Sequence, residues 1–364
     1  MYPLRQAQFT CLNNDLNYLN DRFGRKIDYL RLSVTDRCNL RCIYCMPQSG
    51  INLLNHYDML TYEELLRSAK IFAKLGIKKV RITGGEPLVR KDIITLIESL
   101  KTIPGIEDIS LTTNGLLLGK YIEELKSAGV ERLNISIDST DPVKYAEITR
   151  GGNLSVVMEN LMKAIEIGFK EIKLNAVITN LLSESDIVNF IKLNTDYPVS
   201  IRFIEIMKID YNSCGKTPDS YLKSNSSIES SGGYIFENKN TMSVKDIIKI
   251  IKKYGDYKKT DEKKGFGPSV YYKDKKSKGM ICFIINNSNA CSFCNRLRLT
   301  PAGKIRLCLF SNMEYDLKQK LRNKELTENA NISDDYIMAE IMEFIKNKPK
   351  NRKESFRSDF AYSK

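Results

Sequence analysis

The sequence contains almost no histidine and no long hydrophobic run, and these two absences narrow the classes of protein it can belong to. His56 is the only histidine among 364 residues, which argues against Ser-His-Asp catalysis and against zinc sites that mix cysteine with histidine. No apolar stretch approaches the roughly 20 residues that a membrane-spanning helix needs. Residues 1–20 are polar and contain no apolar signal-peptide segment. We therefore expect a cytoplasmic protein without a membrane span.

Acidic residues are outnumbered by basic ones. The chain has 57 Lys and Arg against 44 Asp and Glu, a formal net charge of +13. Much of the excess lies in lysine-rich runs at residues 258–264 and 346–357, and such runs are typical of solvated surface. The sequence contains neither a zinc-finger pattern nor an RNP motif. The charge therefore favours a small, highly charged anion over nucleic acid as the ligand.

Six of the nine cysteines fall into two groups. The first has the spacing C-x3-C-x2-C and comprises Cys38, Cys42 and Cys45. The second has the spacing C-x2-C-x13-C and comprises Cys291, Cys294 and Cys308. Disulfides are rare in the cytoplasm, so clustered thiols indicate a metal. Electron-carrying iron–sulfur clusters take four cysteines, so each group of three suits a [4Fe–4S] cluster with one iron left open.

The second cysteine group and Cys282 each allow another interpretation than an iron–sulfur ligand. Zinc with a borrowed fourth ligand remains an alternative for the second group. Cys282 lies in an apolar strand-like stretch, Met280–Ile285, and is expected to be a buried free thiol.

Strand-like and helix-like segments alternate from residue 29 to residue 205. We expect strands at residues 29–33, 78–83, 106–112, 132–138, 171–178 and 199–205, with helices at 62–75, 91–101, 119–128, 156–167 and 185–193. Thr61 and Glu64 have the spacing of a capping box at the first helix. This alternation implies right-handed crossovers and a parallel sheet. The expected fold is α/β, a partial (βα)6 barrel of TIM type, with its chemistry at the C-terminal ends of the strands.

The alternation stops near residue 207, and we divide the chain into four parts. Residues 1–23 are an N-terminal extension and residues 24–208 the partial barrel. Residues 209–242, rich in Ser, Asn, Gly and Lys, are predicted to be a loop or insertion. Residues 243–364 form a C-terminal domain that carries the second cysteine group. In this domain we expect helices at 244–254 and 334–346 and a hairpin that pairs 269–272 with 280–285.

The first cysteine group resembles that of the radical SAM superfamily. In that superfamily this pattern holds a [4Fe–4S] cluster whose fourth iron binds S-adenosylmethionine (SAM), the source of a 5′-deoxyadenosyl radical. Tyr44, just before the third cysteine, matches the aromatic position beside the adenine. Gly84, Gly85, Glu86 and Pro87 resemble the superfamily's GGEP segment at the end of the second strand. The resemblance implies that these glycines let the backbone approach SAM.

A narrower resemblance covers most of the chain, about residues 21–310. The segments DRFGRKIDYLRLSVTDRCNLRCIYCMP (21–47), KKVRITGGEPLVRKD (78–92) and CNRLRLTPAGKIRLCLF (294–310) are similar to those of the GTP 3′,8-cyclase family of molybdenum-cofactor biosynthesis. The resemblance implies that SAM is bound by Tyr44, Gly84, Gly85, Glu86, Ser136 and Met207. It also implies GTP contacts at Arg31, Lys79, Arg81, Thr112, Lys173, Arg202, Arg296 and Arg298, the last two beside a second [4Fe–4S] cluster.

The strand pattern of the sequence also supports a cation inside the barrel. Arg81 lies between Val80 and Ile82, and successive side chains of a strand point to opposite faces. If Val80 and Ile82 pack against helices, Arg81 points into the barrel. Guanidinium groups match phosphate oxygens in shape and charge, so an inward-facing arginine suits a triphosphate.

By the same resemblance, the adenosyl radical removes hydrogen from the 3′ carbon of the GTP ribose, and the carbon radical attacks guanine C8. One electron and one proton then give 3′,8-cyclo-7,8-dihydro-GTP. The second cluster would hold the guanine edge, with Arg298 as a catalytic residue near C8. The implied partners are GTP, an electron donor such as flavodoxin or ferredoxin, and a downstream cyclic pyranopterin synthase, with a homodimer left open.

Two segments depart from the family pattern. Family members usually end in Gly-Gly, whereas this sequence ends in DFAYSK (359–364). The segment 212–233 is also longer than the family normally has there. The alternatives are a paralogue acting on another nucleotide, a peptide-modifying radical SAM enzyme and a redox or sensor protein that carries a cluster without catalysis. A peptide-modifying enzyme and a redox or sensor protein do not need cations along the barrel strands.

Overall fold

The computed structural model describes residues 19–47, 50–206, 241–262, 269–285, 291–311, 313–323 and 330–355. The predictions for Met207, for the segment 212–233 and for the last six residues of the chain lie outside these ranges. Within the described ranges, no helix is both long enough and apolar enough to span a membrane.

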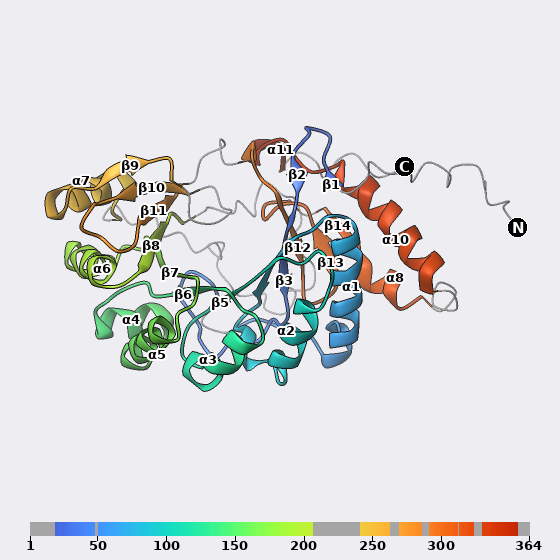
Figure 1. Cartoon of the computed structure of the whole chain (residues 1–364), viewed down its shortest axis with the longest axis horizontal. Coiled ribbons are helices and arrows are strands. Elements are labelled where there is room, and N and C mark those ends of the chain that lie inside the picture. Colours follow the sequence, from blue (N-terminus) through green and yellow to red (C-terminus); the bar gives the residue numbers. More distant parts are fainter. Residues whose placement is uncertain are drawn as a thin grey trace, which may run out of the picture.

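One parallel sheet forms the centre of the fold (Figure 1). Its six central strands follow one another in chain order: β3 (Tyr29–Ser33), β4 (Lys79–Thr83), β5 (Asp108–Thr113), β6 (Arg132–Ser136), β7 (Glu171–Val177) and β8 (Val199–Ile204). The connecting helices are α1 (Tyr62–Lys74), α2 (Ile93–Lys101), α3 (Leu118–Ser127), α4 (Pro142–Thr149), α5 (Leu154–Ile167) and α6 (Glu184–Asp196). The partial barrel of strand–helix units is confirmed, and α4 is a helix that the sequence analysis did not anticipate.

The strands bury apolar side chains on one face and polar side chains on the other. Val80 and Ile82 have no exposed surface and belong to the hydrophobic core, whereas Arg81 between them lines a cavity on the opposite face. The prediction that Arg81 points into the barrel is therefore confirmed. The capping box at α1 is confirmed as well, since Thr61 accepts from the Glu64 amide and the Glu64 carboxylate accepts from the Thr61 amide.

The C-terminal part of the chain extends the barrel sheet at both edges, as Figure 1 shows. At one edge β11 (Ile281–Ile284) pairs in parallel with β8 and is followed by β10 (Val270–Lys273) and β9 (Lys258–Thr260). At the other edge β12 (Arg296–Leu299) pairs in parallel with β3 and is followed by β13 (Lys304–Arg306) and β14 (Glu314–Asp316). The expected hairpin is confirmed as the antiparallel pair of β10 and β11.

The remaining elements surround these edges. Helix α7 (Val244–Tyr254) packs against α6, and α10 (Ala330–Ile345) packs against α1. The short helices α8 (Leu317–Leu321) and α11 (Arg352–Ser355) complete the C-terminal part. A small hairpin, β1 (Leu19–Asn20) with β2 (Lys26–Ile27), lies against α10. This hairpin crosses the boundary that we placed between residues 23 and 24, so the first two expected parts share an element.

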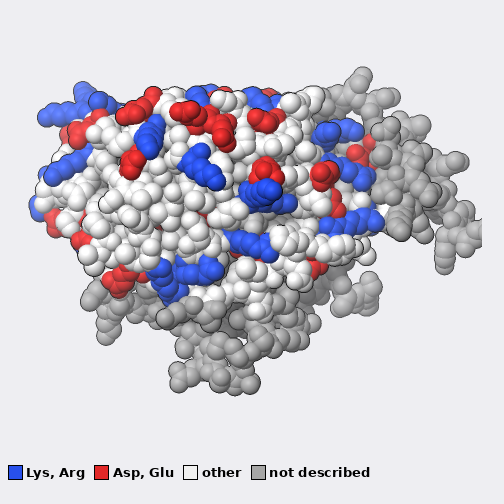
Figure 2. All heavy atoms as spheres, turned by 90° about the horizontal axis from the view of Figure 1, so that it is seen from below, with Lys and Arg blue, Asp and Glu red and all other residues white. Residues whose placement is uncertain are grey.

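Positive and negative side chains are mixed on the molecular surface in Figure 2. On the face that the figure shows, Lys and Arg side chains lie among Asp and Glu side chains. Among the described residues, several exposed charges are paired, for example Lys163 with Glu159 at 2.7 Å and Lys253 with Glu184 at 2.8 Å. Mixed surface charge of this kind does not resemble the basic stripe of a nucleic-acid-binding protein.

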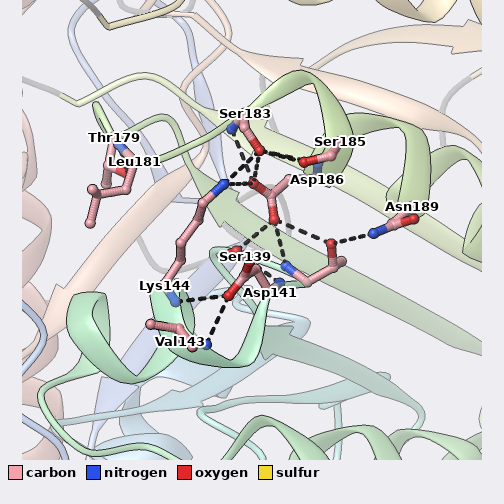
Figure 3. A network of polar contacts seen from close by, with 11 residues as sticks. Ser139, Asp141, Val143, Lys144, Thr179, Leu181, Ser183, Ser185, Asp186 and Asn189 are labelled. Atoms are coloured by element: carbon pink, nitrogen blue, oxygen red, sulfur yellow. Dashed lines mark hydrogen bonds and ion pairs between the residues drawn. The ribbon is translucent and has the colours of Figure 1, made fainter.

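A buried carboxylate ties the loop after β6 to the start of α6 (Figure 3). Asp186 is 1% exposed and accepts hydrogen bonds from the Ser139 hydroxyl at 2.5 Å, the Thr140 amide at 2.9 Å and the Ser183 amide at 3.0 Å. Lys144 adds an ion pair at 3.4 Å. Burial alone would raise the pKa of Asp186, but the hydrogen bonds from Ser139 and Ser183 outweigh it and lower the pKa to about 2.

Replacing Asp186 with asparagine is expected to destabilise the metal-free protein in a pH-dependent way. The carboxyl pKa is about 3.9 in an unfolded chain and lower in the fold, so the charge stabilises the fold above pH 4 and loses this effect as the pH falls toward 2. The expected loss is about 2 kcal/mol near pH 7. Urea unfolding at pH 7 and pH 3 measures it, with Asp196→Asn at the exposed end of α6 as the control. Equal pH dependence in both variants would contradict the assignment.

Candidate active site

The first cysteine group lies on the loop that follows β3. Cys38 and Cys42 are half-buried, Cys45 is exposed, and all three are free thiols. The loop turns at the end of the group, where the amides of Cys45 and Met46 both donate to the Cys42 carbonyl, at 2.9 and 3.1 Å. Burial raises the pKa of all three thiols, that of Cys42 to about 12. A bound cation is therefore needed to hold the three as thiolates.

The GGEP segment packs directly against this loop. The Gly85 amide donates to the Thr35 carbonyl and the Glu86 amide to the Arg37 carbonyl, both at 2.8 Å. A Cβ atom on Gly85 would lie 2.2 Å from the Arg37 oxygen, and one on Gly84 would lie 2.6 Å from the Thr35 oxygen. The two glycines thus allow the end of β4 to contact the cysteine loop, a reason that the sequence analysis did not identify.

The Glu86 carboxylate is directed at the protein. It is 1% exposed and accepts from the Asn114 amide at 2.6 Å, the Thr113 hydroxyl at 2.8 Å and the Leu88 amide at 3.1 Å. Burial raises its pKa to about 7. These contacts join the ends of β4 and β5, so the Glu86 carboxylate fixes the GGEP segment against the end of β5. That Glu86 belongs to the SAM-binding residues stays a prediction.

Tyr44 is held by a buried aspartate that the sequence analysis missed. Its hydroxyl donates to Asp138 Oδ2 at 2.8 Å, and Asp138 Oδ1 accepts from the Val177 amide at 2.8 Å. Burial raises the pKa of Asp138 to about 6. Asp138 comes two residues after Ser136, which ends β6, so the aromatic ring of the cysteine loop is fixed to the end of that strand. In the sequence, the sign that could have indicated this contact was a single acidic residue at the end of a predicted barrel strand.

The barrel interior contains a cavity that opens to solvent and is lined mainly by charged and polar side chains. Six of the predicted substrate contacts line it, namely Arg31, Arg81, Thr112, Lys173, Arg202 and Arg296. Arg298 lines an adjoining cavity together with Gly84, and Arg31 lines both. The two cavities therefore share a wall and connect the region of the GGEP segment with the barrel interior.

Three guanidinium groups lie side by side across the strands. Arg298 of β12 is in register with Arg31 of β3, which is in register with Arg81 of β4. Burial, and next the charges of Arg298 and Arg81, lower the pKa of Arg31 well below its usual value. Burial and Arg296 lower the pKa of Arg298 to about 10. The side chains of Arg31 and Arg298 form no hydrogen bond or ion pair with a carboxylate among the residues that the structure describes. The row of guanidinium groups is therefore suited to bind an anion.

Two other predicted cations already have acidic partners. Lys173 is 2% exposed and pairs with Glu171 at 2.5 Å, and burial followed by the charge of Arg202 lowers its pKa to about 8. Lys79 pairs with Asp28 at 2.8 Å and is not among the residues that line the cavity. The row of guanidinium groups is therefore the stronger anion site, because among the described residues neither Arg298 nor Arg31 forms an ion pair. Lys79 is the first residue of β4 and lies outside the cavity lining.

At the N-terminal ends of the barrel strands, the cavity is lined by charged residues that were not predicted from the sequence. Arg132 pairs with Asp108 at 2.6 Å and with Glu171 at 3.3 Å. Asp108, Arg132 and Glu171 are the first residues of three adjacent strands. Each of them is followed along its strand by a buried apolar residue, and this alternation could have predicted that their side chains face the barrel interior. Their ion pairs join the N-terminal ends of β5, β6 and β7.

Within the described part of the chain, several buried polar atoms of the cavity-lining residues have no hydrogen-bond partner, and two of these atoms belong to predicted substrate contacts. These two are the Thr112 hydroxyl and the Nε of Arg202, although another nitrogen of Arg202 donates to Asn134 and Asn175, both at 3.3 Å. Buried polar groups without a hydrogen bond cost free energy, so a polar ligand in the cavity would stabilise both.

The second cysteine group lies beside β12. Its three free thiols, Cys291, Cys294 and Cys308, are all half-buried. Burial would raise the pKa of Cys294, but the charges of Lys348 and Arg296 and hydrogen bonds from Arg296 lower it to about 6. Arg298 interacts electrostatically with Cys308 and Cys294. The expectation that Arg296 and Arg298 lie next to this group agrees with these contacts.

The donor sets fit iron–sulfur clusters better than single ions. Among the described residues, no three His, Cys, Asp or Glu side chains gather closely enough to hold one metal ion. A single zinc ion needs its ligands at one point, whereas a four-iron cluster binds each thiolate at a different iron. Cys282 is the buried free thiol that was expected.

Comparisons with known proteins agree with this geometry. The sequence profile of the radical SAM superfamily matches residues 32–193, and the profile described as Molybdenum Cofactor Synthesis C matches residues 228–354. The GTP 3′,8-cyclase of Alkaliphilus metalliredigens is 45% identical over 305 residues, which are 84% of this chain and 88% of that protein. The GTP 3′,8-cyclase of Peptoclostridium acidaminophilum is 41% identical over 335 residues, 91% of this chain and 92% of that protein.

A solved structure supports the fold independently. Streptococcus suis SuiB bound to S-adenosylmethionine matches with a TM-score of 0.54 and 14% identity over 85% of this chain and 67% of that one. At this identity the likeness concerns the arrangement of strands and helices. The curated relatives are far more similar and extend over both cysteine groups. The chain is therefore a radical SAM enzyme and belongs to the GTP 3′,8-cyclase family.

Proposed function

We propose that this chain converts GTP to 3′,8-cyclo-7,8-dihydro-GTP, the first step of molybdenum-cofactor biosynthesis. The observation that carries the proposal is the row of Arg298, Arg31 and Arg81 across three neighbouring strands. Two of these guanidinium groups have no carboxylate partner among the described residues, and a triphosphate supplies several negative charges with matching geometry. The location of the row between the two cysteine groups suits a nucleotide that must reach both.

The barrel residues bind and orient the nucleotide. Arg31, Arg81 and Arg202 contact phosphate oxygens, with Lys173 as a weaker contact because it is already paired with Glu171. The Thr112 hydroxyl and the Arg202 Nε gain the hydrogen bonds that they lack. Holding the substrate in one orientation is the main contribution that a protein makes to a cofactor-driven reaction.

Cys38, Cys42 and Cys45 would hold the first [4Fe–4S] cluster, which together with SAM would supply the radical that removes hydrogen from the ribose. The residues that would bind SAM are Tyr44, Gly84, Gly85, Glu86, Ser136 and Met207. Asp138 keeps the Tyr44 ring at the end of β6. Glu86 keeps the end of β4 against β5. The glycine contacts keep the cysteine loop at a fixed distance from β4.

Cys291, Cys294 and Cys308 would hold the second [4Fe–4S] cluster, whose open iron suits the guanine edge. Arg298 is the catalytic residue that we assign to guanine C8. In the reaction the C3′–H bond breaks and a C3′–C8 bond forms, and one electron and one proton complete the dihydro product. The buried Arg298 guanidinium stabilises negative charge that develops on the purine as this electron arrives.

The proposal extends to the cellular setting. The extra electron requires a donor such as flavodoxin or ferredoxin, and the product requires a downstream cyclic pyranopterin synthase, both in the cytoplasm. The division into parts at residues 1–23, 24–208, 209–242 and 243–364 also remains a proposal. Because strands of the C-terminal part pair with β3 and β8, we expect the barrel and the C-terminal part to unfold together.

Anaerobic reconstitution tests the function directly. The protein is loaded with iron and sulfide, supplied with SAM and a reductant, and offered each nucleoside triphosphate in turn. We expect 5′-deoxyadenosine and a cyclised product with GTP alone, and about eight irons per chain for two clusters. Cleavage of SAM with GTP unchanged, or cyclisation of a different nucleotide, would overturn the cyclase assignment while leaving the superfamily intact.

A further inference from the structure

A buried lysine beside the second cysteine group has no role in the proposed reaction. Lys348 follows α10 and is 2% exposed. Its ammonium donates to the Arg296 carbonyl at 2.8 Å and to the Leu307 carbonyl at 2.5 Å. Arg296 is two residues after Cys294, and Leu307 is the residue before Cys308. One side chain therefore joins the two segments that carry these cysteines.

The charge of Lys348 lacks an acidic partner. No carboxylate among the described residues forms an ion pair with it, and an unpaired ammonium is costly to bury. The negative groups with which it interacts electrostatically are the thiols of Cys294 and Cys308 in their ionised form. Three thiolates around an iron–sulfur cluster supply negative charge at this place, so the bound cluster is the natural partner of the ammonium.

A second buried contact fixes the position of Lys348 from the other end of the chain. The Arg25 guanidinium donates to the Pro349 carbonyl at 2.7 Å and to the Cys291 carbonyl at 2.7 Å. Asp21 pairs with the same guanidinium at 2.5 Å, and both side chains are almost fully buried. The hairpin of β1 and β2 therefore holds the backbone next to Lys348 and the first residue of the cysteine group together. An ammonium held in this way cannot move away to solvent.

We propose that Lys348 is a positioning residue of the second iron–sulfur cluster, which ties the segments of Cys294 and Cys308 together and places a fixed positive charge beside the cluster. This inference rests on the second cluster of the proposed function. Charge and hydrogen bonding around a cluster set its reduction potential. A nearby cation stabilises the reduced form, which carries one more negative charge, so Lys348 raises the midpoint potential of this cluster.

The test uses the full chain with the first cysteine group removed. In a parent variant with Cys38→Ala, Cys42→Ala and Cys45→Ala, reconstituted iron reports the second cluster alone, at about four irons per chain. Lys348→Met and Lys348→Arg are compared in this background. Lys346→Met is the matched control, because Lys346 is exposed and pairs with Glu343 at 2.6 Å. The measurements are iron content, the midpoint potential by spectroscopic titration and the melting temperature of the metal-free protein.

We expect Lys348→Met to shift the midpoint to a more negative potential, Lys348→Arg to restore most of the shift, and Lys346→Met to match the parent. Loss of iron in Lys348→Met also supports the proposal if Lys348→Arg retains iron and the metal-free proteins melt together. An unchanged midpoint at full iron content overturns it, as does iron loss with an equal loss of melting temperature in both Lys348 variants. A parent without iron overturns the second cluster itself, which separates that failure from a failure of Lys348.

Discussion

Arg298→Ala is expected to abolish the cyclisation of GTP while the cleavage of SAM remains measurable. Arg298 lies in the guanidinium row, on strand β12, which runs between Cys294 and Cys308 of the second cysteine group. It lines the same cavity as Gly84, and its side chain forms no hydrogen bond or ion pair with a carboxylate among the described residues. Removing a preorganised charge of this kind typically costs a factor of about 10² to 10³ in rate. The formation of 5′-deoxyadenosine should fall far less, because Arg298 belongs to the substrate side of the site.

The measurement follows both products of one anaerobic reaction, 5′-deoxyadenosine and the cyclised nucleotide. Arg298→Lys separates charge from shape, since lysine keeps the charge but not the planar fork. Arg67→Ala is the control, because Arg67 pairs with Asp334 at 2.9 Å on the outer surface. Equal loss of SAM cleavage and cyclisation in Arg298→Ala would count against a role on the substrate side.

The sequence predicted the fold well wherever a local pattern is sufficient. Each barrel strand alternates buried apolar residues with polar ones, and most connecting helices have an apolar face, so the six central strands and the helices near them, except α4, could be found. Arg81 shows how far this reasoning extends, because its two apolar neighbours in the strand are enough to predict the direction of the guanidinium. The cysteine spacings likewise predicted the two groups, and the family assignment built on them is confirmed by the curated relatives.

The sequence could not predict contacts between distant segments. Strands β11 and β12 come from the C-terminal part but pair with β8 and β3, and no local pattern indicates which edge a short strand will join. The buried contacts of Lys348 and Arg25 depend on the same long-range arrangement. For Gly84 and Gly85, the motif was recognised, but its physical reason was not, because the Thr35 and Arg37 carbonyls that demand glycine come from another loop.

Cys42→Ala and Cys294→Ala are expected to affect the two halves of the reaction differently. Cys42 belongs to the loop between β3 and α1, which contacts the GGEP segment, whereas Cys294 precedes β12 and lies beside Arg296 and Lys348. Cys42→Ala should reduce 5′-deoxyadenosine and the cyclised product to background, because the first cluster loses a thiolate ligand. Cys294→Ala should abolish the cyclised product but leave 5′-deoxyadenosine detectable, because it removes a ligand only from the second cluster.

Iron content and both products are measured for each variant, with Cys282→Ser as the control at a buried thiol outside the two groups. Each cluster-site variant should retain about four of the expected eight irons, which shows that the other cluster has assembled. Were Cys294→Ala to lose SAM cleavage as completely as Cys42→Ala does, the two groups could not act at separate steps. The guanidinium row would then have to serve the radical-forming side as well, since it is the structural link between the two cysteine groups.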